Sequence, residues 1–131
     1  MRFNKIIFNE NGDYETKSGM VDNIADLNVL KEIAKDDPDY RIRLKAVEKI
    51  FDDGFLKKVA LKDSNRKVMI AAVDNIQSQD YLAEIAEGHS DCHVRTAAIK
   101  NITDISILEY LAKRESNRQI RDLALETISN L

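Results

Sequence analysis

The stretch NRKVMIAAVDNIQSQDYLAEIAEGHS, residues 65–90, decides the fold of this chain. Its first half places apolar side chains at i, i+4, i+5 and i+8, which is one face of an α-helix, and the alternation of a β-strand is absent there. These residues are Val68, Ala72, Val73 and Ile76. The second half is shorter and places Leu82, Ile85 and Ala86 at i, i+3 and i+4. The stretch therefore predicts two consecutive helices that form a hairpin.

The same pattern returns every 26 residues along the chain. Five aligned columns keep this step: Ala34, Ala60, Ala86 and Ala112; Ala46, Ala72, Ala98 and Ala124; Ile24, Ile50, Ile76, Ile102 and Ile128; Leu30, Leu56, Leu82 and Leu108; and Val21, Val47, Val73, Ile99 and Leu125. A period of this size indicates stacked supersecondary units that bury their apolar stripes against one another. We therefore predict an all-α fold with repeats at about 13–38, 39–64, 65–90, 91–116 and 117–131.

The ends of the expected helices are marked by residues with known positional preferences. Side chains able to cap a helix start occupy one repeated position, as Asp39, Asn65, Asp91 and Asn117. Pro38 precedes the first of them, so a helix is expected to end ahead of it. The expected turns lie near residues 36–38, 52–54, 62–64, 78–80, 88–90 and 104–106.

Both ends of the chain depart from the repeat. Gly19 falls inside the first expected helix of repeat 13–38, where glycine costs about 1 kcal/mol relative to alanine, so this helix is expected to be short or late. Residues 1–12 are expected to form an N-terminal cap, either as a half-helix or as a strand and turn. Residues 117–131 hold a first helix with no second helix after it.

That last helix is expected to present Ile120, Leu125 and Ile128 without a following hairpin to cover them. Because repeat arrays need polar end caps for solubility, two outcomes are open. The final polar residues cover the helix locally and the chain is a monomer, or the chain self-associates end to end. The local cap is the favoured outcome.

Composition places residues 1–131 in a single globular domain. Hydrophobic residues make up 44% of the chain and charged residues 33%, with a formal net charge of −3. This balance argues against disorder and gives no bulk attraction for DNA or anionic lipid. Cys92 is the single cysteine, which excludes an intrachain disulfide and favours a reducing compartment. No segment resembles a signal peptide or a membrane span, so we expect a cytoplasmic protein with no membrane partner.

The stretch DDPDYRIRLKAV, residues 36–47, resembles the signature of HEAT repeats, in which an Asp-Pro-Asp turn leads into a helix that opens with Val-Arg. Val94-Arg95 and Ile120-Arg121 return to the same element. The resemblance covers residues 13–131 and is closest to the short HEAT-like repeats of bacterial and archaeal α-solenoids, which are similar to leucine-rich-repeat variants. It implies a right-handed α-solenoid, an armadillo-type superhelix of 26-residue helical hairpins, although this unit is shorter than the common HEAT period.

The resemblance also implies a ladder between repeats, in which an arginine of each first helix meets an aspartate of a turn. Arg43, Arg95 and Arg121 occupy the arginine position, and Met69 replaces the arginine in the repeat between. The ladder is therefore expected to be interrupted at Met69.

By the same resemblance, the first helix of each repeat lines a concave groove. The candidate partner-binding residues there are Tyr40, Arg41, Leu44, Lys45, Arg66, Lys67, Ile70, His93, Lys100 and Arg118. Basic residues outnumber acidic ones at the groove positions, although the whole chain is negative. The groove positions differ between repeats while the core columns do not. That contrast is typical of a binding groove and equally of unconstrained solvent-facing positions, and both interpretations stay open.

Catalytic and metal-binding patterns are weak in this sequence. His89, Cys92 and His93 have the residue types and spacing of zinc ligands. However, His89 stands at a turn position that carboxylates fill in other repeats, and no fourth ligand is identified. Cys92 and His93 are neighbours that point in different directions on a helix, with no acid to orient them. We therefore expect no metal, no cofactor and no catalytic residues.

The function expected from the sequence is a non-enzymatic scaffold or adaptor that grips a protein partner, with an acidic segment, in its groove. The first alternative is a nucleic-acid-binding HEAT-like domain. It is disfavoured because nucleic-acid-binding grooves usually contain more basic residues than this one, and also aromatic side chains on which bases stack. Tyr40 is the sole aromatic among the groove positions here. The second alternative is an enzyme of the HEAT-like glycosylase or chromophore-lyase kind.

Overall fold

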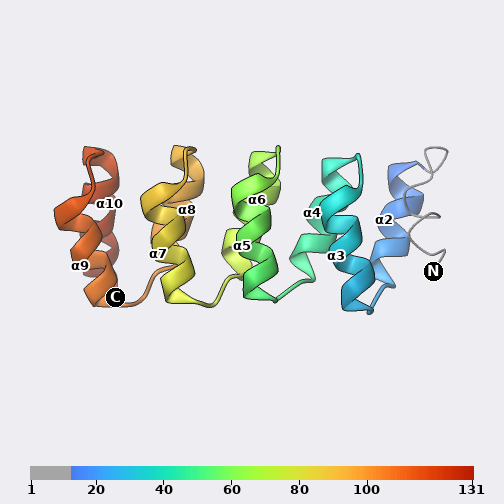
Figure 1. Ribbon diagram of the computed structural model, residues 1–131, viewed down its shortest axis with the longest axis horizontal. Helices are drawn as coiled ribbons and strands as arrows, with labels where there is room; N and C mark the ends of the chain where they lie inside the picture. The colour runs from blue at the N-terminus through green and yellow to red at the C-terminus, as the bar shows by residue number, and fades with distance from the viewer. Residues whose placement is uncertain (1–12) are drawn as a thin grey trace.

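The computed structural model describes residues 13–131, and within this range the chain forms nine α-helices and no strand (Figure 1). They are α2 (Tyr14–Asp22), α3 (Leu27–Asp36), α4 (Tyr40–Glu48), α5 (Asp53–Lys62), α6 (Arg66–Asn75), α7 (Gln79–Gly88), α8 (Cys92–Asn101), α9 (Ile105–Arg114) and α10 (Arg118–Ser129). The predicted all-α class is confirmed for this part of the chain. The cap expected at residues 1–12 lies outside the described residues.

Helices of two kinds alternate. The first helices of the repeats are α2, α4, α6, α8 and α10, and each begins 26 residues after the one before, at Tyr14, Tyr40, Arg66, Cys92 and Arg118. The second helices are α3, α5, α7 and α9, and they keep the same step from Leu27 to Asp53, Gln79 and Ile105. The sequence period is thus also the period of the helix starts.

The expectation of a short or late first helix in repeat 13–38 is wrong. Helix α2 begins in register with α4 and has the same 9 residues, with Gly19 inside it. Asp13 caps its start, because the Asp13 carboxylate accepts a hydrogen bond of 2.8 Å from the backbone N–H of Thr16. Val21, near its end, is fully buried. The cap and the burial outweigh the glycine penalty of about 1 kcal/mol.

Side-chain caps begin every helix in the described range. The caps predicted at the first helices, Asp39, Asn65, Asp91 and Asn117, are confirmed. The turns predicted at 52–54, 78–80 and 104–106 are wrong in position, because α5, α7 and α9 begin inside those ranges. Asp52, Ser78 and Asp104 cap these three helices and end each turn earlier.

The helices pack in two rows. First helices contact first helices along the whole series from α2 to α10. Each second helix packs most closely on the first helix that follows it in the chain, which gives the pairs α3 with α4, α5 with α6, α7 with α8, and α9 with α10 (Figure 1). The compact pair therefore straddles the sequence boundary between two repeats.

This pairing corrects the picture of the last helix. Ile120 of α10 is 1% exposed, because α10 packs against both α9 and α8. Leu125, in contrast, is 54% exposed and Ile128 is half-buried. The apolar surface at this end is thus smaller than predicted, and of the three predicted residues Leu125 alone stays largely exposed.

The core follows the aligned columns of the sequence. Ala46, Ala72, Ala98 and Ala124 are all fully buried, as expected where first helices stack on one another. Ile76 and Ile102 are also buried, but both have extended backbone at the C-cap of their helices. At the ends of α2, α4, α6 and α8 the isoleucine column therefore seals the turn after the helix, whereas Ile128 still lies inside α10.

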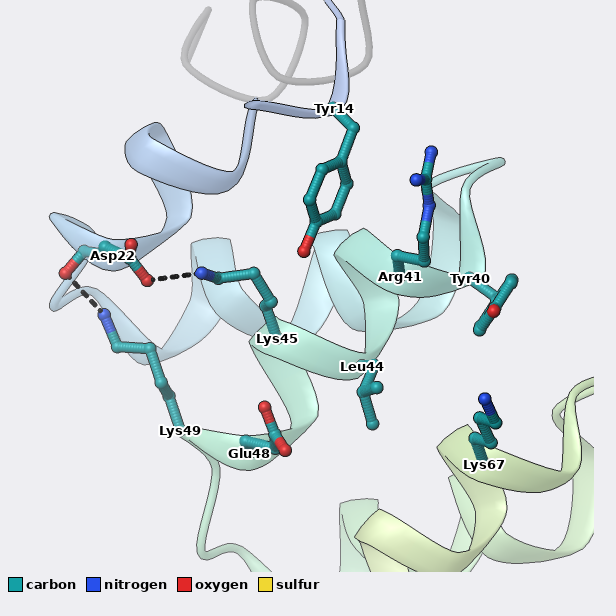
Figure 2. Close-up of a pocket in the computed structure, with 9 residues that line it drawn as sticks. All are labelled: Tyr14, Asp22, Tyr40, Arg41, Leu44, Lys45, Glu48, Lys49 and Lys67. Atoms are coloured by element: carbon teal, nitrogen blue, oxygen red, sulfur yellow. Dashed lines mark hydrogen bonds and ion pairs between the residues drawn. The ribbon is translucent and has the colours of Figure 1, made fainter. Parts of the chain in front are cut away.

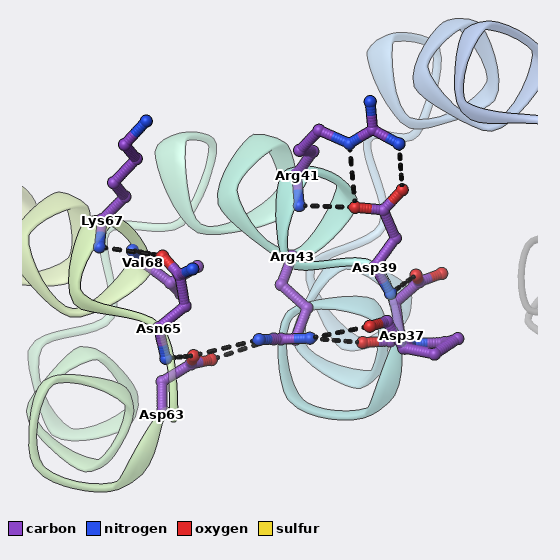
Figure 3. A network of polar contacts seen from close by, with 9 residues as sticks. Asp37, Asp39, Arg41, Arg43, Asp63, Asn65, Lys67 and Val68 are labelled. Atoms are coloured by element: carbon purple, nitrogen blue, oxygen red, sulfur yellow. Dashed lines mark hydrogen bonds and ion pairs between the residues drawn. The ribbon is translucent and has the colours of Figure 1, made fainter.

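Arg43 links neighbouring repeats through a buried ion pair (Figure 3). Its guanidinium donates to the Asp63 carboxylate at 3.0 and 3.2 Å, and also to the backbone carbonyl of Asp37 at 2.8 Å. Equivalent pairs join Lys17 to Asp37 at 3.4 Å and Arg95 to Glu115. The ladder expected from the sequence is confirmed at Arg43 and Arg95. At the third predicted position, Arg121 forms no ion pair with a residue of 13–131 and donates instead to the backbone carbonyls of Glu115 and Ser116, at 2.9 and 3.0 Å.

The predicted interruption at Met69 is confirmed, and its partner position has changed as well. Where the other repeats carry a carboxylate, His89 stands, 8% exposed. The His89 Nδ1 accepts from the backbone N–H of Asp91 at 2.9 Å, and its Nε2 lies 2.7 Å from the carbonyl oxygen of Ala60. Since Nδ1 accepts, Nε2 holds the proton and donates to Ala60, so the ring is neutral. Two hydrogen bonds replace the ion pair at this junction.

Candidate partner-binding groove

A hollow of about 530 Å³ lies on the row of first helices, between α2, α4 and α6 (Figure 2). We call it the cationic hollow. It is lined by Tyr14, Asp22, Tyr40, Arg41, Leu44, Lys45, Glu48, Lys49 and Lys67. Four of these side chains are basic and two are acidic, a difference of 4 − 2 = +2. Of the predicted groove residues, the structure brings Tyr40, Arg41, Leu44, Lys45 and Lys67 together here.

Helix α4 supplies most of the hollow because of its spacing. Arg41, Leu44, Lys45 and Glu48 follow one another at i, i+3, i+4 and i+7, which places them on one face of the helix. The opposite face holds the buried Ile42, Arg43, Ala46 and Val47. The packing of the core therefore turns the polar face of α4 toward the hollow.

Arg41 is held in place on one side of the hollow. Its guanidinium donates to both carboxylate oxygens of Asp39, at 3.1 and 2.8 Å, and lies 4.2 Å from the centre of the Tyr14 ring. The hydrogen bond lowers the pKa of the Asp39 carboxyl and raises the pKa of Arg41. Arg41 and Tyr14 thus form a preorganised wall.

Two lysines on the α2 side also have partners within the chain. Lys45 Nζ lies 2.9 Å from the Asp22 carboxylate, and this hydrogen bond raises the pKa of the Lys45 ammonium. Lys49 Nζ donates to the carbonyl oxygens of Val21, Asp22 and Ile24 at the end of α2, at 2.9, 3.1 and 2.6 Å. Lys49 therefore serves mainly to end α2, and the positive charge of Lys45 is partly balanced.

Lys67 is the basic side chain most open to a ligand. It extends from the first turn of α6 toward the hollow (Figure 2), is exposed, and forms no ion pair with any residue in 13–131. Tyr40 and Leu44 of α4, both half-buried, lie next to Lys67 in the lining of the hollow. The accessible part of the site is thus an ammonium group next to an aromatic ring and an aliphatic side chain.

The other predicted groove residues lie outside the cationic hollow. Arg66 Nε donates to Asp91 at 2.8 Å and lowers the pKa of that carboxyl to about 2. His93 is exposed, with its Nδ1 3.5 Å from the Asp91 carboxylate. Ile70 is half-buried against the core.

Lys100 lines a separate hollow with α10, and Arg118 is highly exposed, 3.8 Å from Asp122. The Arg66–Asp91 pair neutralises the row of first helices between α6 and α8. The predicted basic residues that gather in one hollow therefore lie at the α2–α6 end of the groove.

Glu48 also stands at a groove position of the repeat, and three residues of the hollow were not expected from the sequence: Tyr14, Asp22 and Lys49. The repeat holds the signal that finds two of them, because Tyr14 and Asp22 stand 26 residues before Tyr40 and Glu48. Lys49 has no such signal, since Asn75 holds its position in the next repeat. There Asn75 Nδ2 donates to the carbonyl oxygens that end α4, at 3.1 to 3.2 Å.

The suspected zinc ligands do not converge. His89 is buried and hydrogen-bonded to Ala60 and Asp91, whereas Cys92 and His93 are exposed at the start of α8. Across residues 13–131, no group of three or more His, Cys, Asp or Glu side chains is placed to hold a metal ion. None of the helices described there has the length and apolar character needed to cross a membrane.

Comparison of the chain with protein-family models, with curated proteins and with solved structures finds no match. The assignment of a function therefore depends on the geometry of the site.

Proposed function

We propose that this chain is a non-enzymatic scaffold or adaptor that binds an acidic segment of a protein partner in the cationic hollow. As the framework, we propose a right-handed, HEAT-like α-solenoid built from 26-residue helical hairpins. The alternation of first and second helices and the ladder through Arg43 support this framework. We place the protein in the cytoplasm, in keeping with its single cysteine.

The observation that carries the proposal is the chemistry of the hollow. Lys67 offers an exposed ammonium, and Leu44 and Tyr40 offer partly exposed apolar surface beside it. A volume of about 530 Å³ is suitable for two or three side chains of a peptide. The ligand that fits best is a short segment in which Asp or Glu stands next to an apolar side chain. The positive charge raises the association rate of such a segment and selects against basic ones.

Nucleic acid fits the same hollow less well. Asp22 and Glu48 lie in its lining and repel phosphates. One face of Tyr14 is occupied by Arg41 and Tyr40 is half-buried, so little aromatic surface is left on which a base can stack. Lys45 and Lys49 are engaged within the chain, which leaves few cations for consecutive phosphates.

Selection of a displayed peptide library on the purified protein tests the proposal. We expect enrichment of peptides with acidic and apolar residues together, and their binding should weaken as salt concentration rises. Lys67→Glu should lower their affinity by roughly tenfold or more, because it replaces attraction with repulsion at the open edge of the hollow. Lys113→Glu, an exposed position on α9, is the matched control and should leave affinity unchanged. Enriched peptides without acidic residues, or equal binding by both variants, would contradict the proposal.

A further inference from the structure

The row of second helices carries two hollows of opposite charge. The basic groove lies between α3 and α5, has a volume of about 430 Å³, and includes Lys35, Phe55, Lys58, Val59 and Lys62. The acidic groove lies between α7 and α9, has a volume of about 470 Å³, and includes Asp80, Glu84, Glu87, Ile107 and Tyr110. Both belong to the row opposite the first helices, so neither is part of the cationic hollow.

The two grooves share three lining positions of the repeat. Lys35, Phe55 and Lys58 stand 52 residues, two periods of 26, before Glu87, Ile107 and Tyr110. The apolar floor is kept, as Phe55 in one groove and Ile107 in the other, while the charge at the rim changes from Lys35 to Glu87. The repeat therefore builds two partly equivalent grooves of opposite sign.

The charges at both rims are available to a ligand. Lys35, Lys58 and Lys62 are exposed, and none forms an ion pair with another residue of the described range. The same holds for Asp80 and Glu87. Glu84 is engaged by Lys57 across the α5–α7 contact, and Asp63 beside the basic groove is engaged by Arg43. At the rims of the two grooves, three cations and two carboxylates are thus free of ion pairs within residues 13–131.

The arrangement along the row is symmetric in form. Helices α5 and α7 contact each other at its centre, and one groove lies on either side of them. A twofold axis that lies in the surface of the row at this contact, parallel to the helices, exchanges the positions of the two grooves. The basic groove of each molecule then faces the acidic groove of the other. This is the self-complementary contact of a C2 dimer.

We propose that the row of second helices is a homodimer interface in which the basic groove of each copy receives the acidic groove of the other. Exposed apolar side chains support the same assignment, since Tyr110 is 46% and Leu61 48% exposed on this row. Tyr110 is a residue type enriched in interface cores. Glu87 lies beside it in the acidic groove, and the Arg114 guanidinium lies 5.2 Å from the centre of its ring. Such a small and strongly charged contact is expected to be weak and sensitive to salt. The partner-binding hollows remain open on the outer faces of the dimer.

A charge-exchange experiment tests this interface in analytical ultracentrifugation. The wild-type chain should show a monomer–dimer equilibrium that shifts toward monomer as salt is added. Lys58→Glu with Lys62→Glu makes both grooves acidic, and Asp80→Lys with Glu87→Lys makes both basic, so each variant alone should dimerise roughly tenfold or more weakly than wild type. Mixing the two variants should restore a dimer, because every groove then meets one of opposite sign.

Lys100→Glu with Arg118→Glu, on the row of first helices, changes the net charge by the same amount as the first variant and is the matched control. It should dimerise as wild type does. All variants should keep the wild-type melting temperature, since the changed side chains are exposed. A monomeric wild type, an assembly that grows beyond the dimer, or a mixture of variants that stays monomeric would overturn the proposal.

Discussion

The alanine and isoleucine columns of the repeat occupy equivalent buried positions in each repeat. Ala72 is fully buried on α6, which packs between α4 and α8, so its side chain occupies a position with helices on both sides. Ile76, 4% exposed, lies in extended backbone just after the same helix and closes the turn over the core. Each column is thus tied to one contact that every repeat forms with its neighbours.

Substitutions in these columns should destabilise the fold. Ala72→Leu should cost about 1–3 kcal/mol, because extra volume cannot be accommodated between α4 and α8. Ile76→Ala should cost about 2–5 kcal/mol through lost burial and the cavity left behind. Gln77→Ala, at the exposed neighbouring position, should have little effect. Denaturant unfolding measures all three free energies, and similar small values for the three variants would exclude stacking through these columns.

The Arg66–Asp91 pair should make stability depend on acid pH. The folded-state pKa of Asp91 is lowered to about 2, chiefly by its hydrogen bond with Arg66. Its stabilising contribution is therefore fully present above the unfolded pKa of about 3.9 and is lost as the pH falls toward 2. Asp91→Asn keeps a capping side chain, as Asn65 and Asn117 show in other repeats, but removes the charge. Urea unfolding between pH 5 and 2 should show a shallower loss of stability for this variant. A loss as steep as in wild type would contradict the assignment.

At the scale of the helices, the position where a helix starts is set by nearby residues, whereas the choice of its packing partner is set by contacts between distant residues. The starts of the first helices follow from caps such as Asn65 and Asp91, which act within a few residues, so the sequence predicts these starts well. The pairing of each second helix with the following first helix depends on contacts across the repeat boundary, and no local pattern distinguishes it from the opposite pairing. The length of α2 also depends on packing, because the burial of Val21 outweighs the local helix-weakening effect of Gly19.

The junction of Met69 and His89 provides a test of the ladder. Met69→Arg alone should destabilise the protein, because the new guanidinium lies near a neutral His89 and not a carboxylate. His89→Asp alone should also destabilise it, since the hydrogen bond to the Ala60 carbonyl is lost. The double variant should recover stability, because the introduced guanidinium can then pair with the introduced carboxylate in the manner of Arg43 with Asp63.

A double-mutant cycle by urea unfolding measures this coupling, which we expect to be favourable and on the order of 1 kcal/mol or more. Strictly additive effects of the two substitutions would show that the introduced arginine and aspartate do not interact. An ion pair would then not stabilise this junction.

At the scale of the whole molecule, the candidate site is a part of the groove predicted from the sequence. Tyr40, Arg41, Leu44, Lys45 and Lys67 meet in the cationic hollow because they occupy equivalent faces of adjacent first helices. Arg66, His93 and Lys100 do not join them. The reason is the Arg66–Asp91 ion pair and the separate position of Lys100 beside α10, and both depend on side-chain contacts between repeats that residue spacing does not reveal.

The central claim, that the cationic hollow binds an acidic segment of a partner, is tested most directly by NMR. An acidic, apolar peptide selected on the protein is titrated into the ¹⁵N-labelled chain, and the amide shifts are followed. We predict saturable shifts that centre on Arg41, Leu44 and Lys45 of α4 and on Lys67 of α6, with α9 unaffected. Shifts centred on the second helices, or no saturable shifts at all, would contradict the account.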